Sequence, residues 1–100
     1  MKDFDMAIQL NPEYAEAYFN RGNIHRIREE YDKALEDYTA AIQLKADYAD
    51  AYLNRGNVHE INGEYNPAIL DWENVLRIRP GSNSVKLNIE NARQHLDSGK

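Results

Sequence analysis

Three histidines are the residues in this chain of 100 residues that are best suited to catalysis or metal binding. They stand far apart in the sequence, so each belongs to a different segment. His59-Glu60 begins like the zinc motif H-E-x-x-H, but Gly63 occupies the place of the second histidine. The sequence contains no cysteine and none of the glycine-rich phosphate loops or serine-nucleophile motifs. We therefore expect no enzyme, no metal site and no cofactor.

Two arginines and three aspartates repeat at one interval. The distance from Arg21 to Arg55 in the sequence is the same as that between successive members of the series Asp3, Asp37 and Asp71. A guanidinium on a packing surface needs a counter-charge, because an unpaired buried charge is costly. The shared interval predicts a ladder of Arg–Asp pairs between helices, with an anion-binding site as the alternative. The sequence leaves open whether each arginine pairs within its own repeat or with the preceding one.

Six asparagines form two further series with the same interval: Asn20, Asn54 and Asn88, and Asn23, Asn57 and Asn91. Asparagine is a poor helix former, so its recurrence at helical spacing indicates another use. Each side-chain amide both donates and accepts, so a row of amides can pair with the peptide groups of a ligand. The alternative is that these amides bind water, or one another, between adjacent helices.

These residues recur because the chain is an internal repeat. Residues 14–45 and 48–79 are identical at 14 of 32 positions, including the string Asn-Arg-Gly-Asn at 20–23 and 54–57. Residues 1–11 match 35–45 at five positions, so the sequence begins halfway through a repeat.

Each repeat has the apolar spacing of two helices. We predict first helices at about 15–28 and 49–62, second helices at about 32–45 and 66–79, and a last helix at about 83–97. Breaks fall at Glu29-Glu30 and at Asn62-Gly63. With only eight glycines and prolines, the sequence favours an all-α fold.

The spacing of large and small residues resembles the tetratricopeptide repeat. The matching positions are Tyr18, Arg21, Gly22, His25, Ala34 and Tyr38, and then Tyr52, Arg55, Gly56, His59, Ala68 and Trp72. The resemblance implies an α-solenoid with a right-handed superhelix in one domain. Its parts are a half repeat (1–12), two repeats (13–46 and 47–80) and a C-terminal capping helix (81–100). His25 and His59 occupy a tyrosine place in the pattern, so we expect them to pack in the core.

The resemblance also implies a function. In tetratricopeptide proteins one face of the first helices lines a concave groove that holds peptides. The predicted groove residues are Phe19, Asn20, Asn23, Arg26, Ile27, Leu53, Asn54, Asn57, Glu60, Ile61, Asn88 and Asn91. Relatives that grip the acidic C-terminus of heat-shock chaperones use basic residues at places held here by Phe19, Ser84 and Asn88. That carboxylate clamp is absent from this sequence.

Charge and hydropathy limit the classes of partner that we expect this chain to bind. Seventeen acidic and twelve basic residues give a net charge of −5, which opposes binding to nucleic acid or anionic membrane. No apolar run is long enough for a membrane span, and no signal peptide is recognisable at the N-terminus, which favours a cytoplasmic location. The acidic surface favours a neutral or basic peptide.

The predicted function is a scaffold that binds a peptide or protein segment in the groove. One alternative is self-assembly through residues 1–11, because Phe4, Met6, Ile8 and Leu10 cannot all be covered within the chain. The opposite end carries a polar outer face, formed by Lys86, Glu90, Arg93 and Asp97. The other alternative is a structural spacer segment of a longer repeat protein.

Overall fold

The computed structural model describes residues 2–10 and 14–98, and these residues form six α-helices and no strand. The helices are α1 (Lys2–Leu10), α2 (Ala15–Ile27), α3 (Tyr31–Leu44), α4 (Ala49–Ile61), α5 (Tyr65–Ile78) and α6 (Asn83–Ser98). Each predicted helix boundary lies within one residue of the observed one, so the predicted all-α arrangement is confirmed.

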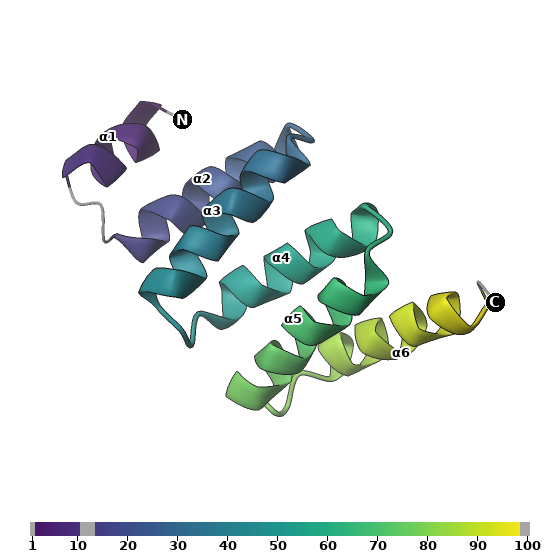
Figure 1. Ribbon diagram of the computed structural model, residues 1–100. Helices are drawn as coiled ribbons and strands as arrows, with labels where there is room; N and C mark the ends of the chain where they lie inside the picture. The colour runs from purple at the N-terminus through teal and green to yellow at the C-terminus, as the bar shows by residue number, and fades with distance from the viewer. Residues whose placement is uncertain (1, 11–13, 99–100) are drawn as a thin grey trace.

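Successive helices pack against one another as antiparallel neighbours along an elongated body of 47 × 27 × 17 Å (Figure 1). The pairs α2–α3 and α4–α5 are the two repeats, and α3 also packs against α4. Helices α2 and α4 contact each other directly. The first helices of the two repeats are therefore adjacent, and α6 follows α5 as the first helix of the next repeat would.

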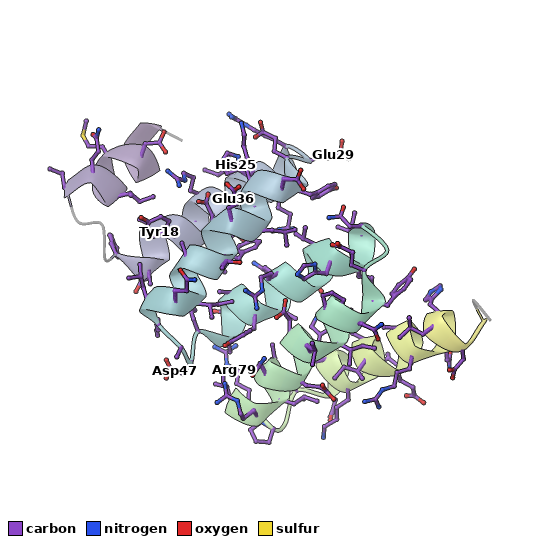
Figure 2. All side chains as sticks on the ribbon, viewed as in Figure 1. Tyr18, His25, Glu29, Glu36, Asp47 and Arg79 are labelled. Atoms are coloured by element: carbon purple, nitrogen blue, oxygen red, sulfur yellow. The ribbon has the colours of Figure 1, made fainter. Side chains whose placement is uncertain are left out.

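The turn inside each repeat has the same backbone geometry. In the second repeat, Gly63 (φ +77°) donates to the Glu60 carbonyl and Glu64 donates to the His59 carbonyl. These two bonds are the Schellman arrangement that ends many helices at a left-handed glycine. Both bonds recur one repeat earlier, where Glu29 takes the left-handed place with φ +62° at the tip of the α2–α3 turn (Figure 2).

A glycine lies opposite a fully buried aromatic ring in each helix pair. A Cβ atom at Gly22 would lie 2.9 Å from a ring carbon of Tyr38, and one at Gly56 would lie 2.6 Å from Trp72 Nε1. Tyr38 and Trp72 have no exposed surface. The missing side chain is therefore what lets the two helices of each repeat approach so closely.

The apolar core is larger toward the C-terminus. Around α3 and α4 the buried cluster comprises Ala34, Tyr38 and Val58. Around α5 and α6 it comprises Ala68, Ile69, Trp72, Val75, Val85, Ile89 and Ala92. Helix α6 thus covers the second repeat with one apolar face.

The two ends of the array differ as the sequence predicts. On α6 the side chains of Lys86, Glu90, Arg93 and Asp97 are exposed. On α1, Met6 is 54% exposed and Leu10 is 81% exposed, whereas Ile8 is half-buried. The predicted exposure of Phe4 falls outside the described side chains. The described part of α1 therefore presents apolar surface to solvent.

Replacing Gly56 by alanine should lower the free energy of unfolding by about 1–3 kcal/mol, because the new methyl group would overlap the Trp72 ring. Gly56→Leu should cost more. Urea unfolding measures the change. The matched control is Gly81→Ala, because a Cβ atom at Gly81 would have no atom within 4 Å other than those of the adjacent residues in the chain. Its effect on the free energy of unfolding should stay within about 0.5 kcal/mol. Equal stability of the Gly56→Ala and wild-type chains would contradict this account of the contact.

Candidate functional site

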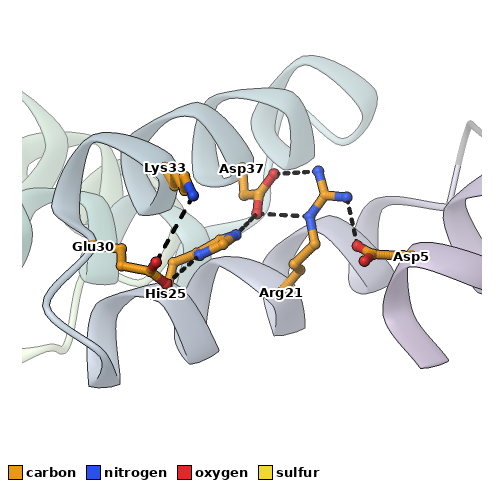
Figure 3. Close-up of polar contacts among 6 residues, drawn as sticks. All are labelled: Asp5, Arg21, His25, Glu30, Lys33 and Asp37. Carbon is orange, nitrogen blue, oxygen red and sulfur yellow. Dashed lines mark hydrogen bonds and ion pairs between the residues drawn. The ribbon is translucent and has the colours of Figure 1, made fainter. Parts of the chain in front are cut away.

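A buried carboxylate organises the polar contacts between α2 and α3. Asp37, 5% exposed, accepts hydrogen bonds from Arg21 Nε at 2.9 Å and from Arg21 Nη2 at 2.7 Å (Figure 3). Arg21 Nη1 also donates to Asp5 of α1 at 2.9 Å. Arg21 therefore pairs both within its own repeat and with the preceding helix. An Arg–Asp pair between helices was predicted, and the structure shows that Asp37 is the partner in the same repeat. The Asp3 side chain lies outside the described ones.

The second repeat builds the same contact. Arg55 donates to both oxygens of Asp71, at 2.9 and 2.7 Å, and its Nη1 donates to Thr39 Oγ1 at 3.2 Å. Thr39 thus takes the place that Asp5 holds one repeat earlier. Hydrogen bonds to the carboxylates raise the pKa of both Arg21 and Arg55. Because the guanidinium groups are directed at protein acceptors, the arginines have a structural role rather than forming an anion site.

The two histidines of the repeats lie beside these ion pairs. His25 is buried, with Nδ1 3.0 Å from Glu30 Oε1 and Nε2 3.6 Å from Asp37 Oδ2 (Figure 3). In the same way, His59 Nδ1 lies 3.0 Å from Glu64 Oε1, and His59 Nε2 lies 3.8 Å from Asp71 Oδ2. The prediction that these histidines pack between helices is confirmed for buried His25, while His59 is half-buried. The contact with each histidine lowers the pKa of Glu30 and of Glu64.

Two members of the asparagine series, Asn23 and Asn54, are bonded within the protein. Asn23 Oδ1 accepts from the Tyr38 hydroxyl at 2.5 Å and from Asn54 Nδ2 at 2.9 Å. Arg26 Nε donates to the same hydroxyl at 3.3 Å. Burial raises the pKa of Tyr38, so the hydroxyl keeps its proton and donates it to Asn23. At Asn23 and Asn54 the structure thus shows amides that bond one another between adjacent helices.

The other members of the series lack this bonding. Trp72 stands where Tyr38 stands one repeat earlier, and its Nε1 is buried without a hydrogen-bond partner. Within the described part of the chain, the side chains of Asn57, Asn88 and Asn91 have no hydrogen-bond partner, and the same holds for Asn20. Asn57 and Asn88 are half-buried and Asn91 is exposed. Their amide groups therefore have unused hydrogen-bonding capacity.

Some apolar residues of the predicted groove are covered by the protein itself, and others are exposed. Phe19 is half-buried, with its ring centroid 5.0 Å from that of Tyr48 and 5.9 Å from that of Tyr38. Leu53 packs against the C-terminal core cluster. The protein itself therefore covers part of Phe19 and Leu53, which weakens the expectation that a ligand must cover them. The exposed apolar residues on this face are Ile27, Ile61 and Leu87.

A hollow between α4 and α6 includes two residues that the sequence analysis missed. Its lining is formed by Glu60, Asn91, Gln94 and His95. Gln94 and His95 occupy the places that Glu60 and Ile61 hold one repeat earlier, so the repeat interval alone could have identified them. The asparagine series did not include them because α6 carries different residue types at these two places.

Neither a metal centre nor a membrane span is found in the residues that the structure covers. Among them, no group of three or more histidine and carboxylate side chains is arranged to hold a metal ion. None of the helices α1 to α6 is long and apolar enough to span a membrane.

Two family models match the sequence, one described as TPR repeat over residues 22–63 and one as Tetratricopeptide repeat over residues 4–36. The chain belongs to the tetratricopeptide-repeat family. No curated protein matches the sequence closely enough to count as a relative. The chain is also similar to solved structures, among them tetratricopeptide proteins.

Three solved structures illustrate that similarity. The crystal structure of MamA protein is 30% identical with a TM-score of 0.89, covering 93% of this chain and 51% of that chain. YrrB, titled a TPR protein with an unusual peptide-binding site, is 29% identical with a TM-score of 0.85, covering 94% and 48%. The Arabidopsis OM64 TPR domain is 28% identical with a TM-score of 0.86, covering 92% and 76%. The chain spans about half the length of the MamA and YrrB chains.

Acid should destabilise the tetratricopeptide fold through Glu30 and Glu64. In the folded state the pKa of both carboxyl groups lies below the ordinary value of 4.5. Their contribution to the free energy of unfolding is therefore present above pH 4.5 and is lost as the pH falls through the folded-state pKa. Urea unfolding at a series of pH values below about 5 measures this loss. Glu30→Gln should flatten the dependence, and adding Glu64→Gln should flatten it further. An unchanged slope in the double variant would contradict the assignment.

Removing Asn23 and removing Asn57 should have different effects on stability. Asn23→Ala leaves the buried Tyr38 hydroxyl without its acceptor and should cost about 1–3 kcal/mol. Asn57→Ala, at the same place one repeat later, removes no bond to the described part of the protein and should leave the unfolding free energy within about 0.5 kcal/mol. Thermal or urea unfolding of the two variants tests the difference. Equal losses would mean that both asparagines are structural.

Proposed function

We propose that this chain is a scaffold that binds a peptide or an extended protein segment along the face formed by α2, α4 and α6. The working unit is the half repeat, the two full repeats and the closing helix together. The observation that carries the proposal is the set of unbonded amides at Asn57, Asn88 and Asn91 on α4 and α6. Exposed Ile61 and Leu87 belong to the same two helices.

The chemistry of these side chains suits a peptide. Each amide offers one acceptor oxygen and two donor hydrogens, which match the carbonyl and N–H groups of an extended backbone. Exposed apolar side chains nearby add burial when a ligand covers them. The likeness to YrrB, whose title records a peptide-binding site, supports this choice of ligand class.

The charge of the face favours a neutral or basic ligand. It carries the carboxylates of Glu16 and Glu60 and the guanidinium of Arg26, whereas the Asp50 carboxylate is paired with Arg79 at 2.9 Å. The chain as a whole has a net charge of −5. Like charges across an interface are unfavourable, so an acidic segment would bind less well.

Selection from a random peptide library displayed on phage tests the proposal. We expect the chain to enrich peptides that bind it in solution. The double variant Asn57→Ala/Asn88→Ala should weaken that binding about tenfold or more at unchanged thermal stability. Asn66→Ala, an exposed asparagine on α5, is the matched control and should leave the affinity unchanged. No enriched peptide, or equal binding by the double variant, would overturn the proposal.

A second candidate function is self-assembly through α1. The exposed side chains of Met6 and Leu10 favour it, because covering apolar surface stabilises association. Light scattering should then show a mass that rises with protein concentration, and Leu10→Lys should abolish the rise. A constant mass would eliminate this candidate. If peptide selection also fails, a structural spacer segment remains as the function.

A further inference from the structure

The hollow between α4 and α6 holds a carboxylate that the protein leaves unneutralised. Its volume is about 340 Å³, and Glu60, Asn91, Gln94 and His95 line it. Glu60 is half-buried, and within the described residues its side chain has neither a hydrogen bond nor an ion pair. By contrast, the carboxylates that organise the helix pairs, Asp37 and Asp71, each have a cationic partner.

The preceding repeat carries the opposite charge at the same place. Arg26 occupies the position that corresponds to Glu60, and its Nε donates to the Tyr38 hydroxyl. In the second repeat Trp72 replaces Tyr38 and offers no acceptor, and Glu60 replaces the arginine. The change of charge therefore turns a position that is bonded within the protein into one with free acceptor capacity.

The other lining groups suit a cation. Asn91 and Gln94 each contribute a side-chain carbonyl oxygen that accepts hydrogen bonds. The His95 ring is stacked on Tyr65, with centroids 5.0 Å apart and planes 4° apart, so its position is held by α5. An ammonium or guanidinium group donates several hydrogen bonds and accepts none, which matches a carboxylate flanked by amide oxygens.

We propose that this hollow binds one lysine or arginine side chain of the partner segment, with Glu60 as its counter-ion and the Asn91 and Gln94 oxygens as further acceptors. The inference rests on the proposed peptide-binding function and specifies which ligand side chain that function requires. The volume lies at the lower end of the range for ligand pockets, which fits one long side chain rather than a whole small molecule.

The test uses peptides from the phage selection in which each lysine is replaced by norleucine and each arginine by citrulline. At one position of the peptide, wild-type protein should bind the peptide with the basic residue about tenfold more tightly than the peptide with the neutral replacement. Glu60→Gln should lose that preference. Glu90→Gln removes the same charge from the outer face of α6 and should keep the preference, which separates a local contact from the general field of the protein.

A second probe does not depend on the selection. Millimolar N-acetyl-lysine methylamide should shift the side-chain amide NMR signals of Asn91 and Gln94 in wild-type protein and not in Glu60→Gln, whereas N-acetyl-norleucine methylamide should shift neither. If peptides are selected but bind equally with and without their basic residues, this inference fails while the proposed function stands. If no peptide is selected, the proposed function fails. Absence of the lysine-specific NMR shift overturns the hollow as a cation site in either case.

Discussion

The arrangement of this chain depends on neutralising one buried carboxylate in each helix pair. Asp37 and Asp71 are almost fully buried, and each is held by two hydrogen bonds from an arginine on the facing helix. An unpaired charge there would cost several kcal/mol, so the arginine fixes how far one helix can slide along the other. That register sets Gly22 against Tyr38 and Gly56 against the Trp72 ring. The faces that carry the asparagines are positioned by the same constraint.

A single difference between the repeats explains why Asn23 is bonded within the protein and Asn57 is not. Tyr38 ends in a hydroxyl that reaches Asn23, and Asn23 then also accepts a bond from Asn54. Trp72 is equally buried but has no group that reaches Asn57. Asn23 and Asn54 therefore contribute to packing, whereas Asn57, Asn88 and Asn91 keep unused hydrogen-bonding capacity.

Features that depend on spacing alone were predictable from the sequence. The helix boundaries and the presence of Arg–Asp pairs between helices follow from the repeat interval and the period of the α-helix. The choice of Asp37 rather than Asp3 as the partner of Arg21 does not follow from them. The hydrogen bond from Tyr38 to Asn23 was not predictable, because it depends on the length of the Tyr38 side chain and on the position of the Tyr38 ring between two helices. Asp5 was missed as a partner of Arg21 because its counterpart in the next repeat is Thr39, so no repeated charge marked it.

The two clusters of buried residues differ in size, so the two ends of the array should differ in how readily they unfold locally. In repeat arrays, stability is close to a sum over units and their interfaces, so the unit with the smaller buried cluster opens first. Here the smaller cluster lies between α3 and α4, with Phe19 of α2 packed against it, and the α2–α3 turn also holds Glu29 in a left-handed conformation that favours glycine. The unbonded amides of Asn57, Asn88 and Asn91 lie on α4, which packs against both clusters, and on α6, which contributes to the larger one. A segment bound there as proposed would meet side chains on helices that the core already orders, so less conformational entropy would be lost in ordering them.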